Sequence, residues 1–430
     1  MKIMHLPVSF LPYYTGGKEV FVAHLAKELQ KMGHENRVVI HADNRIPAHV
    51  AQYEYNGIPV NVLPAVKITH TQYWRGEASP CDDFEELLKQ YQPDVVHFHD
   101  QSGGASLSHL HIVKRLGIKT LLTYHSPGQS CPQRALLYKG KYLCDGKLNV
   151  RRCTECLYSC KGLPGWVSKL LSQVPITNSN MEKSRLLRLI HLSSSVKNFI
   201  DSFHETYTLH DGVQIHARWI RPLLVSNEVD ERKIFYADLT ILKPEGITDG
   251  KKNTSPAILK LLYVGRCSYI KGVHLLIEAV RLLPKDFPVE VHFLGPYWDN
   301  TTYGRKMLRR IRGDRRFREP ILVEPQHVVS YMQDMDAVVV PSIWPETGPF
   351  VVLEAFHAGV PVIGTRAAGI AERIEHLKNG LLFEWGNTRQ LAQCIELLYQ
   401  RKREGVKFDI PQPRGIEQMA SQILNIYRSL

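Results

Sequence analysis

Two glutamates eight positions apart are the residues of this chain best placed to do chemistry. They are Glu346 and Glu354, in the segment PETGPFVVLEAFHAGVPVIG that spans 345–364. Glu346 precedes a Gly-Pro turn, whereas Glu354 stands inside an almost wholly apolar run. A carboxylate in apolar surroundings is costly unless something pairs with it. A partner is therefore expected opposite Glu354.

The turn between the two glutamates predicts an anion site. A buried-strand run, DAVVVPS, ends before the turn, and a helix begins after it, with Pro349 well suited to its first turn. The free amides and positive dipole end of a helix N-terminus bind anions, phosphate above all. Gly348 lets the backbone come close to such an anion. The amides of Phe350 and Val351 are expected to donate hydrogen bonds to the phosphate.

The two carboxylates would flank this phosphate. Glu346 would repel a diphosphate if aimed at it, so we expect it to point past the phosphate towards uncharged hydroxyls. Glu354 lies on the other side, where the adjacent hydroxyls of a ribose suit a carboxylate. A phosphate with a polyol on each side describes a sugar nucleotide. The alternative is a core helix whose glutamates form structural ion pairs.

The elements that must position these residues follow an alternating rhythm. Short β-rich runs in the first half predict strands; they are KIMHLPV, NRVVIHA, PDVVHFHD, KTLLTYH and LIHLSSS. Amphipathic stretches lie between them, and the same rhythm restarts at LKLLYVG. Strands that alternate with helices predict parallel sheets of βαβ units. Ligands of such sheets bind at the carboxyl ends of the strands.

The chain has 430 residues, which is too long for one ordinary core. We expect two tandem doubly wound Rossmann-like α/β domains facing a central cleft. The N-terminal domain covers 1–225 with a cysteine-rich insert at 127–165, a linker covers 226–258, and the C-terminal domain covers 259–412. A helix in 413–430 is expected to return to the N-terminal domain. No apolar run approaches the roughly 20 residues of a membrane span, and signal-peptide features are missing, so we expect a cytoplasmic protein.

The net charge of +12 is unevenly spread. Eight Lys or Arg residues fall between Arg305 and Arg318, against one acid, Asp314. A solvated helix face is the plain interpretation. The alternatives are contact with an anionic membrane surface or with nucleic acid, of which nucleic acid is the less expected partner.

Five of the eight cysteines fall within thirty residues; they are Cys131, Cys144, Cys153, Cys156 and Cys160. Disulfides are disfavoured in a cytosolic protein. A C-x2-C pair with further cysteines nearby is typical of a tetrahedral zinc site. We expect a structural zinc on four of the five, with Cys144, Cys153, Cys156 and Cys160 as the set. Reduced structural thiols and a disulfide are the alternatives.

Several segments resemble the retaining glycosyltransferases of family 4, which have the two-domain GT-B fold. PETGPFVVLEAFHAGVPVI resembles the E-x7-E signature of that family, and LLYVGRCSYIKGVHLLIEAV its strand, Gly-Arg and Lys-Gly segment. AAGIAERIEHLKNGLLFEWGNTRQLAQCIELL is similar to its closing segment. YYTGGKEVFVAHLAKELQKMGHENRVV resembles its Gly-Gly loop and first helix. The motifs lie in both halves of the chain and in the order of the family.

The resemblance implies a retaining, nucleotide-sugar-dependent hexosyltransferase. In that family, electrostatic stabilisation of the leaving diphosphate is the main task, and no catalytic divalent metal is needed. The resemblance assigns Arg266 and Lys271 to the donor diphosphate. It assigns Gly16 and Gly17, in a loop that opens a helix after the first strand, to the phosphates and the donor sugar.

The remaining roles also follow from the resemblance. His125, at the end of KTLLTYH, would be a catalytic-site residue that orients a donor-sugar hydroxyl, with His97 and His99 in support. Glu346 would hold donor-sugar hydroxyls close to the reacting carbon, and Glu354 would bind the ribose. Both assignments agree with the physical interpretation of the turn.

The resemblance favours a UDP-sugar donor over a GDP-sugar. It also favours a saccharide or lipid-linked saccharide acceptor in polysaccharide or glycoconjugate biosynthesis. The segment GLPGWVSKLLSQV is compatible with lying on a membrane, so we expect a protein that is cytoplasmic or peripheral at the inner face of the membrane. Two alternatives stay open. One is a non-catalytic nucleotide or nucleic-acid-binding protein, and the other is a GT-B epimerase or phosphorylase.

Overall fold

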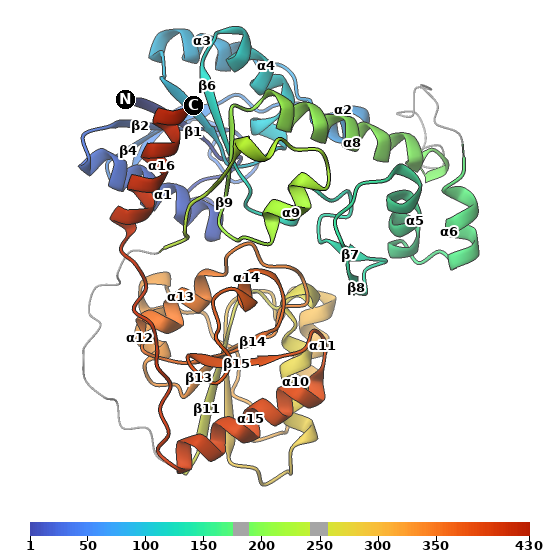
Figure 1. The fold of residues 1–430 in the computed structure, drawn as a ribbon, viewed down its shortest axis with the longest axis vertical. Helices are drawn as coiled ribbons and strands as arrows, with labels where there is room; N and C mark the ends of the chain where they lie inside the picture. Colours follow the sequence, from blue (N-terminus) through green and yellow to red (C-terminus); the bar gives the residue numbers. More distant parts are fainter. Residues whose placement is uncertain (175–188, 241–256) are drawn as a thin grey trace. The chain divides into compact units, whose positions relative to one another are not determined.

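The structure is a computed structural model that describes residues 1–174, 189–240 and 257–430. The described residues form two compact units (Figure 1). The first unit comprises Met1–Asp238 and Ile416–Leu430, and the second unit comprises Leu239–Gly415. Each unit is an α/β domain built on a predominantly parallel sheet. The predicted fold class of two Rossmann-like domains is therefore confirmed.

The first unit contains an eight-stranded sheet with the order β10-β9-β6-β5-β1-β2-β4-β3. All neighbouring strands are parallel except β3 and β4. The strands are β1 Lys2–Leu6, β2 Glu35–His41, β3 Gln52–Tyr55, β4 Ile58–Leu63, β5 Val95–Phe98, β6 Lys119–Thr123, β9 Gly212–Ile215 and β10 Ile234–Tyr236. The growth of the sheet reverses at β1, which pairs with β2 on one side and β5 on the other. Such a switch point is where ligands of these sheets bind.

The helices of the first unit are α1 Gly17–Lys31, α2 His70–Arg75, α3 Asp82–Tyr91, α4 Leu107–Arg115, α5 Val150–Cys160, α6 Gly165–Leu171, α8 Leu192–Leu209, α9 Ile220–Val225 and α16 Ile416–Ser429. A separate hairpin pairs β7 Leu137–Tyr138 with β8 Tyr142–Leu143. Helix α16 packs on α1, so the end of the chain completes the first unit. None of the described helices is long and apolar enough to cross a bilayer.

The second unit contains a five-stranded parallel sheet with the order β12-β11-β13-β14-β15. Its strands are β11 Leu259–Val264, β12 Val289–Leu294, β13 Ala337–Val340, β14 Val362–Thr365 and β15 Gly380–Phe383. Its helices are α10 Val273–Leu282, α11 Thr302–Ile311, α12 Pro325–Met332, α13 Phe350–His357, α14 Ala368–Ala371 and α15 Thr388–Arg403. The switch point lies between β11 and β13, the two strands that precede the predicted donor-binding loops.

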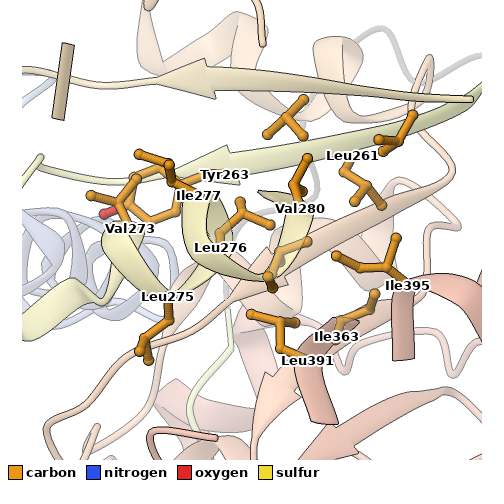
Figure 2. Close-up of a cluster of buried hydrophobic side chains, with 14 of the residues drawn as sticks. Leu261, Tyr263, Val273, Leu275, Leu276, Ile277, Val280, Ile363, Leu391 and Ile395 are labelled. Atoms are coloured by element: carbon orange, nitrogen blue, oxygen red, sulfur yellow. The ribbon is translucent and has the colours of Figure 1, made fainter. Parts of the chain in front are cut away.

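Both faces of this second sheet are buried, as expected when crossover helices cover a parallel sheet. Leu261 and Tyr263 of β11 point into a core formed with α10 and α15 (Figure 2), whereas Leu262 belongs to the core on the opposite face. The alternation follows from the period of two along a strand. The sheet is thereby a rigid support for the loops at its carboxyl edge.

The strand predicted for LIHLSSS is wrong, because Leu192 begins the 18-residue helix α8. The buried apolar side chains of this segment are Leu192, Val196, Phe203 and Tyr207. Their spacings of four and seven residues place them on one face of a helix. The three apolar residues before the serines were too few to distinguish a strand from a helix.

The predicted linker over 226–258 is too long at its start. Residues Ile234–Tyr236 form β10, the edge strand of the first sheet, and pair in parallel with β9. The polar composition of this segment misled the sequence analysis, because an edge strand of three residues carries little periodicity. The remainder of the predicted linker, residues 241–256, lies outside the described residues.

Candidate functional sites in each unit

The second unit brings the predicted cation Lys271 against the predicted acid Glu346. Glu346 is buried, and its Oε1 accepts hydrogen bonds from Lys271 Nζ and Ser342 Oγ, each at 2.7 Å. Lys271 Nζ also lies over the Trp344 ring, 5.1 Å from its centroid. Burial would raise the pKa of Glu346, but the charge and hydrogen bond of Lys271 outweigh it, so the pKa lies below its ordinary value. The result is an ionised acid held in place at the carboxyl end of β13.

A glycine brings the Lys271 loop close to the end of β13. Gly272 has a φ of 72°, and a Cβ there would lie 1.8 Å from the carbonyl oxygen of Pro341. Only glycine fits this close approach. The loops are joined further by the amide of Ile343, which donates to the carbonyl of Ile270 at 2.9 Å. The Lys-Gly pair therefore sets the position of the ammonium group.

Helix α13 begins at Phe350, as predicted, with Pro349 at its N-cap. The side chain of Pro349 makes no capping hydrogen bond at this end. The first amides of a helix have no acceptor inside it, so those of Phe350 and Val351 stand where an anion would bind. Gly348 precedes them in the turn.

Gly369 supports this turn and was missed by the sequence analysis. Its amide donates to the carbonyl of Glu346 at 2.9 Å. A Cβ at this position would lie 2.6 Å from that oxygen and 3.3 Å from the amide nitrogen of Gly348. The available signal was the Ala-Ala-Gly sequence at 367–369, just after β14, where a small residue lets two loops meet.

Glu354 is not held in an internal ion pair. It lies one turn into α13, and no other described residue hydrogen-bonds to its carboxylate or forms an ion pair with it. Burial alone raises the pKa of Glu354 to about 7. An acid in this state is half protonated near neutral pH and gains from any ligand that donates hydrogen bonds to it.

Arg266 follows β11 and is exposed, so its guanidinium can reach a ligand. The buried Tyr263 hydroxyl donates to the carbonyl of Arg266 at 2.9 Å and fixes the backbone there. Gly295, at the end of β12, approaches so closely that a Cβ would lie 2.3 Å from the carbonyl oxygen of Gly265. The second unit thus gathers the predicted donor residues at the carboxyl edge of its sheet.

In the first unit, Gly16 and Gly17 open α1 as predicted, with Gly16 at the N-cap. A Cβ on Gly16 would lie 2.7 Å from Glu19 Oε2, so the turn is tight. Lys18 Nζ donates to Asp100 Oδ2 at 2.8 Å. This pair was missed by the sequence analysis, because 82 residues separate its members.

The predicted histidine His125 ends a hydrogen-bonded chain through the first sheet. His125 Nε2 lies 3.1 Å from His99 Nδ1, and His99 Nε2 lies 3.1 Å from His5 Nδ1. His5 Nε2 lies 3.0 Å from Asn36 Oδ1. Burial is the largest cause that lowers the pKa of each of these three histidines; the pKa of His5 falls to about 4. The rings are therefore neutral at physiological pH.

The orientation of Asn36 sets the proton positions along this chain. Asn36 Nδ2 donates to the carbonyl of His34 at 3.0 Å, which turns Oδ1 towards His5. His5 must then donate from Nε2 and accept at Nδ1. His99 and His125 likewise each donate from Nε2 and keep Nδ1 as the acceptor. His125 consequently carries its proton on Nε2 and offers Nδ1 as a hydrogen-bond acceptor.

His97 belongs to the same cluster but makes separate bonds. Its Nδ1 lies 2.7 Å from the Tyr427 hydroxyl of α16, and its Nε2 lies 2.6 Å from Thr123 Oγ1. One ligand atom from each of His5, His97 and His99 falls within 4.8 Å of the others. Because these rings already use their nitrogens in hydrogen bonds, we interpret the trio as a hydrogen-bonded network and not as a metal site.

The cysteines of the insert are partly brought together. Four of them line one cavity beside the β7–β8 hairpin; they are Cys131, Cys144, Cys153 and Cys156. Cys160, which the sequence analysis placed in the zinc set, is exposed and does not line this cavity. The Cys160 thiol nevertheless interacts with that of Cys156, and the zinc set stays a prediction.

Comparisons with known proteins match both units to glycosyltransferase families. A family model described as "Glycosyl transferases group 1" matches residues 259–401, and one described as "Glycosyltransferase Family 4" matches residues 15–159. The chain carries the two domains of a GT-B glycosyltransferase. Known structures agree on this fold: HepE of Anabaena in complex with UDP-glucose superposes over the whole of both chains, with a TM-score of 0.64 and 15% identity.

Curated relatives of this GT-B chain are distant in sequence. An uncharacterised glycosyltransferase of Methanocaldococcus jannaschii is 23% identical over 441 aligned residues, which cover 100% of this chain and 98% of the relative. A D-inositol 3-phosphate glycosyltransferase of Pseudarthrobacter chlorophenolicus is 28% identical over 171 residues. That match covers 38% of this chain and only 40% of the relative. The substrates of this chain therefore cannot be assigned from these relatives.

Proposed function

We propose that this GT-B chain transfers a hexose from a UDP-sugar to a saccharide or lipid-linked saccharide, with retention of configuration. The observation that carries the proposal is the Lys271–Glu346 pair beside the uncapped N-terminus of α13. It places a cation, an ionised acid and helix amides at the switch point of the second sheet. The printed description of the HepE structure, which contains UDP-glucose, supports a UDP-sugar donor.

The diphosphate of the donor would lie at the start of α13. The amides of Phe350 and Val351 would donate to it, and Arg266 and Lys271 would neutralise the charge that develops as it leaves. Cationic side chains and helix amides would then do the work that a divalent metal does in other transferases. We expect added Mg²⁺ or Mn²⁺ to leave the rate of donor hydrolysis unchanged.

The two acids of the second unit would bind the donor on either side of the diphosphate. Glu346 would accept hydrogen bonds from donor-sugar hydroxyls, a task that suits an acid whose ionised form Lys271 stabilises. Glu354 would accept hydrogen bonds from the ribose. Since no described residue pairs with the carboxylate of Glu354, ribose hydroxyls would supply the partners that its buried position requires.

In the first unit, we propose that His125 accepts a hydrogen bond from a sugar hydroxyl at Nδ1 and that the Gly16–Gly17 turn approaches the donor phosphates. Burial keeps His125 neutral and makes it a weak base. That property suits retaining transfer, in which orientation of the donor matters more than removal of a proton by a strong base.

The insert of the first unit would contribute to acceptor choice, and helix α6, just after the insert, would contact an anionic membrane surface on the cytoplasmic side. On α6, Trp166 is 74% exposed and Leu170 is 61% exposed, and Lys169 lies between them in sequence. Exposed apolar and basic residues on one short helix favour a membrane interface. We expect the protein to sediment with anionic liposomes at low salt and the Trp166→Ser variant to sediment less. Wild-type protein that stays in solution would remove this part of the proposal.

Hydrolysis of nucleotide sugars in the absence of acceptor tests the proposed transfer. We expect slow release of UDP from a UDP-hexose, slower release of GDP from a GDP-hexose, and loss of hydrolysis in Glu346→Ala. Glu375→Ala is the matched control, because that acid belongs to the same unit but pairs with Lys378 at the surface. Unchanged hydrolysis in Glu346→Ala would contradict the assignment. Tight binding of polynucleotides without any hydrolysis would favour a non-catalytic binder instead.

A further inference from the structure

The cavity beside the β7–β8 hairpin of the first unit gathers cysteines from three separate parts of the insert. Cys131 follows β6 and the turn Pro127–Gln129, Cys144 follows β8, and Cys153 and Cys156 lie on α5. The cavity has room for about 20 Å³, which is the space of a single water-sized body. It can hold one ion but not a multi-atom cluster.

One of these four sulfurs accepts a hydrogen bond from the backbone: the amide of Lys139 donates to Cys156 Sγ at 3.0 Å. Nearby backbone amides also lower the pKa of Cys131 and Cys144, but burial outweighs them, so the pKa of each thiol lies above its ordinary value. A thiol is a weak acceptor, whereas amide donors stabilise a thiolate, which is the form that binds a metal.

The surroundings of the cavity also suit a site with several thiolates. Lys147 and Arg152 line it, and Arg152 also forms an ion pair with Asp145 at 2.7 Å. Four thiolates around a divalent cation leave a net charge of −2, which Lys147 and Arg152 offset only in part because Arg152 also pairs with Asp145. The eight cysteines all lie within the described residues, and none of them is in a disulfide.

We propose that Cys131, Cys144, Cys153 and Cys156 bind one structural Zn²⁺ in this cavity. The C-x2-C pair on α5 and the two turns at Cys131 and Cys144 supply a four-sulfur set of the kind that structural zinc prefers. Among the described residues, no three of these sulfurs all lie within 4.8 Å of one another. Binding of zinc would therefore require them to move closer together.

The site would stabilise the loop that carries His125. Gln129, two residues before Cys131, accepts a hydrogen bond from the amide of His125 at 2.6 Å. The Ser130 hydroxyl, next in the chain, bonds with that of Tyr124 at 2.5 Å. A metal on Cys131 would thereby fix one end of the segment that follows β6 and tie it to α5.

Metal analysis of the full chain, purified in reducing buffer without chelator, tests the site. We expect about one zinc per chain. Replacement of zinc by Co²⁺ should give the intense thiolate-to-cobalt absorption of a tetrahedral sulfur site. Less than roughly 0.2 zinc per chain in folded protein would overturn the proposal. Iron in place of zinc, or mass-spectrometric detection of a disulfide among these cysteines, would overturn it too.

Serine variants separate this ligand set from the one that spacing alone predicts. Cys131→Ser should lose most of the zinc, whereas Cys160→Ser and Cys81→Ser, outside the cavity, should keep it. Loss of zinc from Cys160→Ser with retention in Cys131→Ser would overturn the assignment. If Cys131→Ser fails to fold, the wild type decides: a chelator should lower its thermal transition, and added zinc should restore it. A transition that the chelator leaves unchanged would contradict a structural metal.

Discussion

The two units build their candidate sites from opposite kinds of chemistry. In the second unit, the site depends on charge, with Lys271 bonded to the buried Glu346 at 2.7 Å. In the first unit, the chain from Asn36 to His125 is neutral, because burial lowers the pKa of every histidine in it. The charged pair of the second unit can stabilise charge on a ligand. The neutral histidine chain of the first unit fixes the direction in which its rings donate and accept hydrogen bonds.

This difference predicts different responses to damage. Removal of one partner from a buried ion pair leaves a charge that nothing compensates, which is costly both for stability and for function. Removal of one residue from the neutral hydrogen-bonded chain only weakens the constraint on the orientation of the next ring. Substitutions in the second unit should therefore have larger effects than those in the first.

The largest effect is expected for Lys271→Met. It removes the proposed diphosphate cation and leaves Glu346 buried without its main partner. We expect donor hydrolysis to fall by about 100-fold or more and the free energy of unfolding by about 3 kcal/mol. Steady-state hydrolysis and urea denaturation measure the two effects.

Lys378→Met is the matched control for this prediction. Lys378 pairs with Glu375 at 2.9 Å, but both side chains are more than half exposed. Exposed pairs contribute at most about 1 kcal/mol, and neither residue belongs to the candidate site. If Lys378→Met and Lys271→Met lost equal activity or equal stability, burial of the ion pair would not be the cause.

The next effect concerns Glu354 and pH. Its folded-state pKa of about 7 exceeds the ordinary value of 4.5, so the folded state holds a proton that the unfolded state has released. This contribution to stability is fully present below the ordinary pKa and is lost as the pH rises through 7. Full burial would make it about 3 kcal/mol, and partial exposure of the side chain reduces it to about 2 kcal/mol.

Glu354→Gln should remove this dependence. The difference in free energy of unfolding between wild type and variant should change by about 2 kcal/mol between pH 4.5 and pH 8. If ribose hydroxyls bind the carboxylate, UDP should also lower its pKa and release protons near pH 6.5, which calorimetry in two buffers detects. Proton release that persists in Glu354→Gln would assign the titration to another group.

A smaller effect is expected for Asn36→Leu. It removes the acceptor that orients His5, so the tautomer of His125 is no longer fixed, and we expect hydrolysis to fall by about tenfold. Asn36→Asp keeps an acceptor for His5 and should retain more activity than Asn36→Leu, although both lose stability. Nitrogen NMR of labelled histidines reports which ring nitrogen carries the proton. A wild-type His125 protonated on Nδ1 would contradict the proposed direction of the chain.

The same contrast explains what the sequence could predict. Glu346, Gly348, Phe350 and Glu354 lie within nine residues, and one strand–turn–helix pattern places them together. In contrast, Asn36, His5, His99 and His125 meet only because β1 pairs with both β2 and β5. Nothing in the local sequence around His5 indicates that pairing, so the sequence analysis found His125, with His99 in support, through a family resemblance and missed His5 and Asn36.

Errors in the sequence analysis share this cause. The apolar residues before Ser193 looked like the end of a strand, and their helical partners Phe203 and Tyr207 lie more than ten residues further on. The cysteine spacing also gave no sign that Cys131 would line the same cavity as Cys144, Cys153 and Cys156. Spacing in the sequence identifies residues that are close along the chain, whereas folding also brings together residues that are distant in sequence.

The smallest effect is expected for the basic run that begins in α11. Three of its eight cations already pair with acids of the second unit: Arg310 with Glu278, Arg316 with Asp314 and Arg318 with Glu290. Arg305, Lys306 and Arg309 are exposed, while Met307 and Ile311 on the same helix are buried. The run thus has the pattern of a solvated helix face.

Replacement of Arg305, Lys306 and Arg309 together by glutamine should change the free energy of unfolding by less than about 0.5 kcal/mol. Donor hydrolysis should not change, because none of the three lies among the residues proposed to bind the donor. Any binding to anionic liposomes that depends on this face should weaken and become less sensitive to salt. A loss of hydrolysis comparable to that of Lys271→Met would mean that surface charge, and not the buried pair, dominates the second unit.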